Sequence, residues 1–180
     1  MIDPDAGLLV VAGIAILFAT ASWHKWRALG EFGAIVANYR LLPRWSVPLV
    51  SWLVPSLETG LVVGLAVERS RPVAVALAAL LLLGYAIAIA INLRRARTDL
   101  DCGCAARHAR RPIAGWMVVR NVLLAALLAL AAPPWTARPL EPVDFVTLGL
   151  GIAIAALLYL AIDELLGRVV SRAAALGRPA

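Results

Sequence analysis

Residues 73–92 have the sequence VAVALAALLLLGYAIAIAIN, in which every residue except Gly84, Tyr85 and Asn92 is Ala, Val, Leu or Ile. A run of roughly 20 apolar residues is what an α-helix needs to cross the hydrocarbon core of a bilayer. The run is continuous, whereas the strands of a membrane β-barrel alternate between apolar and polar residues. Because backbone polar groups in lipid need partners within their own segment, the run predicts a transmembrane helix.

Four further runs of the same kind occupy residues 8–23, 47–67, 113–132 and 143–162. The chain as a whole is 62% hydrophobic with a mean hydropathy of +0.86, while soluble domains are about 45 to 50% apolar. We therefore predict an all-α integral membrane protein with a four-helix transmembrane bundle and a fifth, C-terminal transmembrane helix. Residues 1–180 are expected to form this one membrane domain, without a separate soluble domain.

A short helix is expected between the first two spans, where residues 23–43 have the sequence WHKWRALGEFGAIVANYRLLP. Its large apolar side chains recur every three or four residues, at Trp23, Trp26, Leu29, Phe32, Val36 and Tyr39. This spacing is typical of an amphipathic helix that lies in the membrane interface, with its aromatic residues at the level of the lipid headgroups.

The formal net charge of +6 would suit nucleic-acid binding in a soluble protein, but in a membrane protein excess Lys and Arg usually sets the orientation. Loops that alternate along the chain carry 13 Lys and Arg residues on one side and 3 on the other, with Arg120 inside a span. The positive-inside rule then places the N-terminus outside, and the C-terminus and the loop at residues 93–112 in the cytoplasm. The first residues, MIDPDAG, lack the positive charge of a secretory signal, so the first helix is expected to be retained.

Two of the predicted spans contain ionisable side chains, which are costly in lipid unless they are paired, protonated or hydrated. Glu58 lies near the middle of the second span, and Arg120 and Asn121 lie in the fourth. An ion pair between Glu58 and Arg120, with hydrogen bonds from Asn92 and Asn121, would satisfy these groups. Such a pair either fixes how the helices pack or takes part in proton transfer or cofactor binding.

Lys25 lies just beyond the first span, where a basic residue is commonly a topology anchor. We expect the polar interior to be lined or braced by Lys25, Tyr39, Glu58, Arg120 and Asn121.

The chain has two cysteines, Cys102 and Cys104, which lie one residue apart in the predicted cytoplasmic loop, within TDLDCGCAARHARRP at residues 98–112. The thiolate is the reactive form of cysteine, and the surrounding arginines favour it by lowering the thiol pKa. Gly103 supplies the backbone freedom to close a small disulfide ring. A strained disulfide of this kind is exchangeable instead of structural. The spacing therefore predicts thiol-disulfide exchange, without indicating which cysteine attacks.

Two other interpretations of the same residues remain open. Cys102, Cys104 and His108 form C-x-C-x3-H, which is able to hold a soft ion such as Cu(I) or Hg(II) in a carrier or sensor. A closed structural zinc site normally has four ligands, and only Asp99 or Asp101 is near enough in sequence to supply a fourth. Alternatively, the cysteines are inert and the chain is a non-catalytic membrane assembly subunit.

The ordered combination of these features resembles the MauE family, the membrane proteins of methylamine utilisation, which are related to DoxX-like bundles. The resemblance covers about residues 10 to 130 and is carried by Lys25, Tyr39, Pro43, Glu58, the Cys102 and Cys104 pair, and Arg120 with Asn121. It implies a bacterial inner-membrane protein that matures a disulfide-containing partner, such as the methylamine dehydrogenase small subunit, alongside a thioredoxin-like protein. The related bundles of DsbB and vitamin K epoxide reductases imply that electrons pass between a cysteine pair and a membrane quinone.

Overall fold

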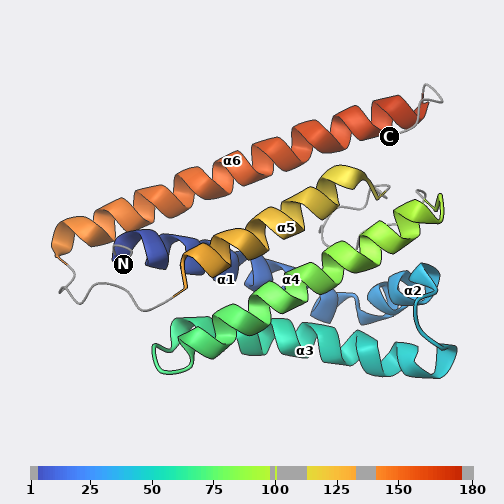
Figure 1. Ribbon diagram of the computed structural model, residues 1–180, viewed down its shortest axis with the longest axis horizontal. Helices are drawn as coiled ribbons and strands as arrows, with labels where there is room; N and C mark the ends of the chain where they lie inside the picture. The colour runs from blue at the N-terminus through green and yellow to red at the C-terminus, as the bar shows by residue number, and fades with distance from the viewer. Residues whose placement is uncertain (1–3, 98–99, 101–112, 133–140, 176–180) are drawn as a thin grey trace.

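The computed structural model describes residues 4–97, 100, 113–132 and 141–175, and the regular elements within these ranges are helices (Figure 1). The long helices are α1 (Pro4–Arg27), α3 (Val47–Ala66), α4 (Arg71–Arg94) and α6 (Pro142–Ala175). The shorter elements are α2 (Leu29–Tyr39), α5 (Gly115–Leu130) and the 3-10 turn η1 (Arg44–Ser46), which leads into α3.

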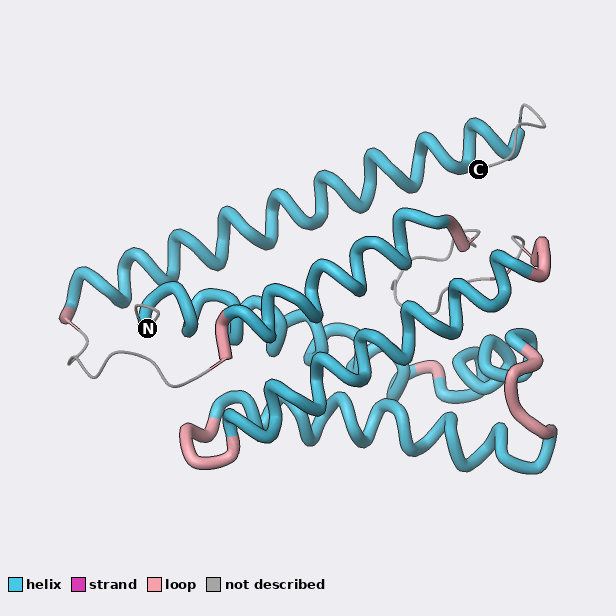
Figure 2. The backbone as a smooth tube through the Cα atoms, viewed as in Figure 1, coloured by secondary structure: helices cyan, strands magenta, loops and turns pink. Residues whose placement is uncertain are grey.

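The long helices alternate in direction through the bundle. Helices α1, α4 and α6 run one way, while α3 and α5 run the other way (Figures 1 and 2). The start of α1 and the α3–α4 turn therefore lie at one end of the bundle. Helix α2, the end of α4 and the start of α5 lie at the opposite end, which we call the α2 end. This alternation agrees with the loop arrangement predicted from the charges.

Four helical segments are long and apolar enough to cross a membrane: α1, α3 together with η1, α4, and α6 as far as Val169. Helix α5 has 16 residues, so it rises about 24 Å, less than the roughly 30 Å of a bilayer core. The protein is thus a multi-pass membrane protein, and the predicted spans at residues 8–23, 47–67, 73–92 and 143–162 are confirmed as long apolar helices. That α5 also crosses the membrane stays a prediction.

The distribution of side chains is the reverse of that in a soluble protein. Leu80 on α4 and Leu157 on α6 are 62% and 66% exposed, whereas Glu58 and Asn92 are both 0% exposed. Charged residues in water-soluble proteins are almost never fully buried, and large apolar patches are seldom left uncovered. An exposed apolar surface around a polar interior is what contact with lipid requires.

The short helix between the first two spans is confirmed, but it begins later than predicted. Helix α1 continues to Arg27, so Trp23 and Trp26 belong to its last turns, and α2 starts at Leu29. Phe32 of α2 is 9% exposed and packs inside the bundle, while the level of the aromatic residues relative to the lipid headgroups stays a prediction. Phe32 lies inside because its ring packs near a buried ammonium group, described below. The position of α2 in the membrane interface stays a prediction.

Helices α1, α3, α4 and α5 share an apolar core that includes Phe18, Leu65, Leu82 and Leu128. Helix α6 packs along α1, where Gly151 lets it approach Leu9; a Cβ at Gly151 would lie 2.9 Å from a Leu9 methyl carbon. The C-terminal residues continue this helix to Ala175, an outcome that the sequence left undecided.

Candidate functional site

A buried charge cluster connects the first four helices. Lys25 in the last turn of α1 forms an ion pair with Glu58 of α3, its Nζ donating to Glu58 Oε1. Tyr85 of α4 donates its hydroxyl to the same Glu58 oxygen at 2.7 Å. The Lys25 and Glu58 side chains are 4% and 1% exposed, so the pair is shielded from solvent and its attraction is strong.

Two aromatic rings complete the surroundings of the Lys25 ammonium group. Its Nζ lies 5.3 Å from the centroid of the Phe32 ring and 5.2 Å from that of the Tyr85 ring. Both distances are within the range of cation–π attraction, which is larger in desolvated sites. Helices α1, α2, α3 and α4 each contribute one side chain, so the lysine–glutamate cluster, consisting of Lys25, Phe32, Glu58 and Tyr85, joins four elements at one point.

The local sequence of α3 explains why Glu58 faces inward. The buried residues of this helix recur every three or four positions and are Ser51, Pro55, Glu58, Leu61 and Leu65. Pro55, about one turn before Glu58, lacks an N–H, so the Ser51 carbonyl loses its usual helical donor. Among the described residues, Glu58 Oε2 is buried without a hydrogen-bond partner. The cluster thus retains one acceptor that is able to take a proton or a hydrogen bond from a bound group.

The predicted ion pair between Glu58 and Arg120 is wrong. Glu58 is paired with Lys25, and Arg120 of α5 instead donates to Asp163 of α6 at 3.1 Å. Lys25 is therefore part of the buried interior and not a surface anchor. Asp163 follows the predicted fifth span directly, so hydropathy alone gave no reason to place it opposite a residue of the fourth.

Arg120 also lies against two aromatic rings. Its guanidinium carbon is 5.2 Å from the Trp116 ring centroid and 5.9 Å from that of Tyr159 on α6. The side chains of Arg120 and Asp163 are 15% and 20% exposed, so the pair is largely withdrawn from solvent. This contact joins α5 to α6, whose apolar surface is otherwise widely exposed.

We expect Arg120→Leu to lower the free energy of unfolding by about 1 to 3 kcal/mol, because Asp163 then keeps its charge without this partner. Unfolding by sodium dodecyl sulfate, followed by circular dichroism, measures the change. The matched control is Arg168→Leu, which breaks an exposed pair with Glu164 four residues away in the same helix. Such pairs contribute about 0.3 to 0.5 kcal/mol, so equal losses in the two variants would contradict the role of Arg120.

The two intramembrane asparagines bond within their own helices instead of to the predicted pair. Asn121 donates to the Met117 carbonyl at 2.8 Å, and Asn92 donates to the Ala88 carbonyl at 3.1 Å. Asn92 also accepts a hydrogen bond from Arg97 at 3.3 Å. The prediction that they support a Glu58–Arg120 pair is therefore wrong, although both are buried as expected.

The segment that carries the cysteines leaves and rejoins the bundle at one place. The Ile113 N–H donates to the Leu100 carbonyl at 2.9 Å, and both side chains are buried beside Met117. Arg97, three residues before Leu100, donates to the backbone carbonyl of Tyr39 at 3.4 Å. Tyr39 packs against the same small apolar cluster. Tyr39 thus lies beside the place where Leu100 and Ile113 meet, and its role in the polar interior stays a prediction.

Cys102, Cys104 and His108 lie outside the described residues, so the structure bears on neither the thiol pair nor the alternative metal site. Within the described ranges, no group of three or more His, Cys, Asp or Glu side chains is arranged to hold a metal ion.

Comparison with known proteins identifies the family of this chain. The family model described as methylamine utilisation protein MauE matches residues 4–134. The chain belongs to the MauE family. This confirms the resemblance noted from the sequence, and the MauE match contains the lysine–glutamate cluster, the cysteine pair and Arg120. Asp163, the partner of Arg120, lies beyond the matched residues.

Individual MauE proteins are similar over most of the chain. The methylamine utilization protein MauE of Paracoccus denitrificans is 39% identical over 155 residues, which are 86% of this chain and 83% of that protein. The proteins of the same name from Methylophilus methylotrophus and Paracoccus versutus are 34% and 38% identical, over 92% and 86% of this chain and 88% and 83% of their own lengths. No solved structure shows a significant match.

Sequence reasoning missed three members of these contacts: Phe32, Tyr85 and Asp163. A signal was present for Tyr85, because its hydroxyl is the only one in the apolar run at residues 73–92. A hydroxyl buried in lipid needs a partner, as a buried carboxylate does. Phe32 and Asp163 carried no comparable signal, since aromatic and acidic residues are ordinary near the ends of spans.

Proposed function

We propose that this chain is a membrane thiol-disulfide exchange protein of methylamine utilisation that uses Cys102 and Cys104 to support redox maturation of a partner protein. The observation that carries the proposal is membership of the MauE family, whose curated relatives are named for methylamine utilization, with the chain's only cysteine pair inside the matched residues. The basic surroundings of the pair in sequence favour the thiolate that such exchange requires.

The proposed reaction exchanges bonds between this pair and a disulfide of a thioredoxin-like or other disulfide-containing protein. A thiolate of the pair attacks one sulfur of the partner's disulfide, forming a mixed disulfide and releasing the partner's second sulfur as a thiolate, which takes a proton from water. The other cysteine, as a thiolate, then attacks its neighbour's sulfur, which closes the Cys102–Cys104 disulfide and releases the partner as a dithiol. Two electrons pass to the partner, and the reverse steps oxidise it, according to the two reduction potentials.

The described contacts support this proposal by giving the cysteine segment a firm base. The backbone hydrogen bond between Leu100 and Ile113 and the contact from Arg97 to Tyr39 hold the segment's two ends at the α2 end. The lysine–glutamate cluster joins the four helices α1, α2, α3 and α4 to one another. We assign Lys25 and Glu58 the role of holding these helices in register.

A membrane quinone forms no step of the proposal. A small pocket between α2 and the start of α3 is lined mostly by apolar groups, and its one hydroxyl, that of Ser51, donates to the Val47 carbonyl at 2.7 Å instead of into the pocket. Quinone carbonyls are acceptors and bind through donors, so this lining does not identify a quinone site.

We propose that the α2 end faces the cytoplasm, because the loops rich in Lys and Arg belong to it. The cytoplasm keeps thiols reduced, which favours a pair that passes reducing equivalents over one that oxidises exported proteins. The inner bacterial membrane is the location that this orientation and the family imply.

Redox-dependent alkylation tests the proposal. Membranes are equilibrated in glutathione buffers of graded ratio and then treated with a maleimide, and the mass of the protein reports the number of free thiols. We expect two maleimide adducts per protein in reducing buffers and none in oxidising buffers. Proteins with a single adduct should be absent at every buffer ratio, because the two thiols are oxidised together to one disulfide. Equal labelling in every buffer would rule out exchange through this pair.

Cys102→Ser serves as the control, since a single cysteine is unable to close the internal disulfide. The same reagent also tests the orientation. A maleimide that does not cross membranes is expected to label the thiols only after the cells are opened, and labelling from outside would overturn the cytoplasmic assignment.

A further inference from the structure

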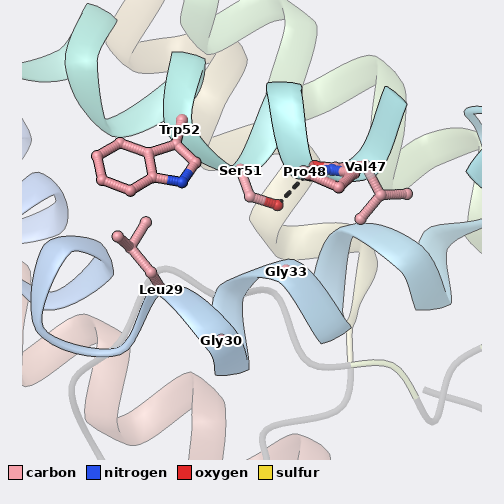
Figure 3. A pocket seen from close by; sticks show the side chains of 7 residues that line it. All are labelled: Leu29, Gly30, Gly33, Val47, Pro48, Ser51 and Trp52. Carbon is pink, nitrogen blue, oxygen red and sulfur yellow. Dashed lines mark hydrogen bonds between the residues drawn. The ribbon is translucent and has the colours of Figure 1, made fainter. Parts of the chain in front are cut away.

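A small apolar pocket lies between α2 and the start of α3, with a volume of about 280 Å³ (Figure 3). Leu29, Gly30 and Gly33 of α2 form one wall, with a side chain only at Leu29, and Val47, Pro48 and Trp52 form the other. The Ser51 hydroxyl is already donated to the Val47 carbonyl, as the dashed line in Figure 3 shows. The interior therefore suits a hydrocarbon chain better than a polar ligand.

The residues around this pocket indicate its depth in the membrane. Trp52 lines the pocket and is 58% exposed, and Trp45 in η1 is 78% exposed. Trp26 of α1 meets Trp52 edge to face, with ring centroids 5.2 Å apart. Indoles gather where acyl chains meet lipid headgroups. An opening at this level is within reach of lipid tails and close to lipid phosphates.

The charge beside the pocket is positive. Residues 40–50 contain Arg40 and Arg44 and no acidic residue, and both arginines are exposed. Arg44 begins the 3-10 turn that leads directly to Val47 and Pro48 of the pocket wall. In the part of the chain that the structure describes, the Arg44 guanidinium has no ion pair or hydrogen bond. Guanidinium groups bind phosphate oxygens through paired, charge-assisted hydrogen bonds.

We propose that this pocket binds an anionic phospholipid, with one acyl chain between α2 and α3 and the phosphate at Arg44. The site is separate from the lysine–glutamate cluster and does not depend on the proposed thiol chemistry. Lipid held here would fill the space that the two glycines leave and would attach α2 to the membrane surface.

Equilibrium binding of phosphatidylglycerol with a fluorescent acyl chain to the detergent-purified full-length protein tests this site. Gly30→Leu is expected to weaken binding by about tenfold or more, because the new side chain occupies the pocket. A Cβ at Gly30 meets nothing within 4 Å, so α2 is able to accept the change. The matched control is Gly60→Leu on the exposed face of α3, where a Cβ also meets nothing within 4 Å.

The phosphate contact is tested by surface variants that leave the pocket intact. Arg44→Gln is expected to weaken phosphatidylglycerol binding by about five- to tenfold and to weaken phosphatidylcholine of the same chain less, because the choline cation offsets the charge of its phosphate. Arg69→Gln, at the opposite end of the bundle, is the matched control, and Glu31→Gln on α2 is expected to leave binding unchanged or to tighten it. Equal affinity for the two lipids, or binding unaffected by Gly30→Leu in a variant with native circular dichroism, would overturn the proposal.

Discussion

Glu58→Leu is expected to lower the free energy of unfolding by about 3 to 5 kcal/mol, because it leaves the Lys25 ammonium buried without its counter-ion. Both side chains are almost inaccessible to solvent, so neither charge is able to move to water without opening the bundle. Lys25→Met is expected to have an effect of similar size, since it leaves the Glu58 carboxylate in the same position.

Replacing Lys25, Glu58 and Tyr85 together should restore most of the stability that either single substitution removes. Replacing a buried ion pair by apolar residues of similar volume is often neutral or stabilising. We therefore expect the combined variant Lys25→Met, Glu58→Leu and Tyr85→Phe to be more stable than either single variant. Tyr85→Phe is included because its hydroxyl would otherwise lose the Glu58 acceptor.

Unfolding by sodium dodecyl sulfate, followed by circular dichroism, measures all of these variants. Glu68→Leu in the exposed turn between α3 and α4 is the matched control and should change stability by less than about 0.5 kcal/mol. If Glu58→Leu and the combined variant had equal free energies of unfolding, the ion pair would not be the interaction that holds these helices together.

Cys102→Ser and Cys104→Ser are each expected to abolish growth on methylamine in a bacterium that depends on this chain as its MauE protein. Thiol-disulfide exchange needs both sulfurs, one to attack and one to resolve the mixed disulfide. Each single variant should therefore behave like the strain without the protein. The amount of protein in the membrane should stay unchanged, because a serine differs from a cysteine by a single side-chain atom and the variants are expected to act through the lost sulfur chemistry.

The control for the cysteine variants is the same chain with Ser56→Ala, an exposed α3 residue that bonds to its own helix. It should support growth normally. Normal growth of the double variant with serine at positions 102 and 104 would instead favour a non-catalytic assembly subunit. Because the Glu58 variants act through folding and the cysteine variants through chemistry, protein abundance in the membrane distinguishes the two effects.

Hydropathy predicted the positions of the long helices well. The runs at residues 8–23, 47–67, 73–92 and 143–162 correspond to α1, α3, α4 and α6. A helix in lipid satisfies its own backbone, so its formation depends little on its neighbours. The helix ends were less well predicted, because α1 and α6 continue into polar residues where the apolar signal stops.

The composition of the site was predicted only in part. An ionisable residue in a span indicates that a partner exists, and this reasoning identified Glu58 and Arg120. It did not identify their partners, because Lys25 and Asp163 lie just beyond the ends of the predicted first and fifth spans. The helix breaks at Ala28 and α2 packs against α3, which places Phe32 near the Lys25 ammonium.

The sequence by itself therefore determined that this is a helical membrane protein of the MauE family, how its loops alternate, and which residues needed explanation inside the bilayer. Those properties depend on local runs of residues and their order. Only the tertiary structure decided that Lys25 pairs with Glu58 and Arg120 with Asp163. The choice of partner depends on how each helix is rotated about its axis and on which side chains fill the space around a charge, and both follow from packing across the whole bundle.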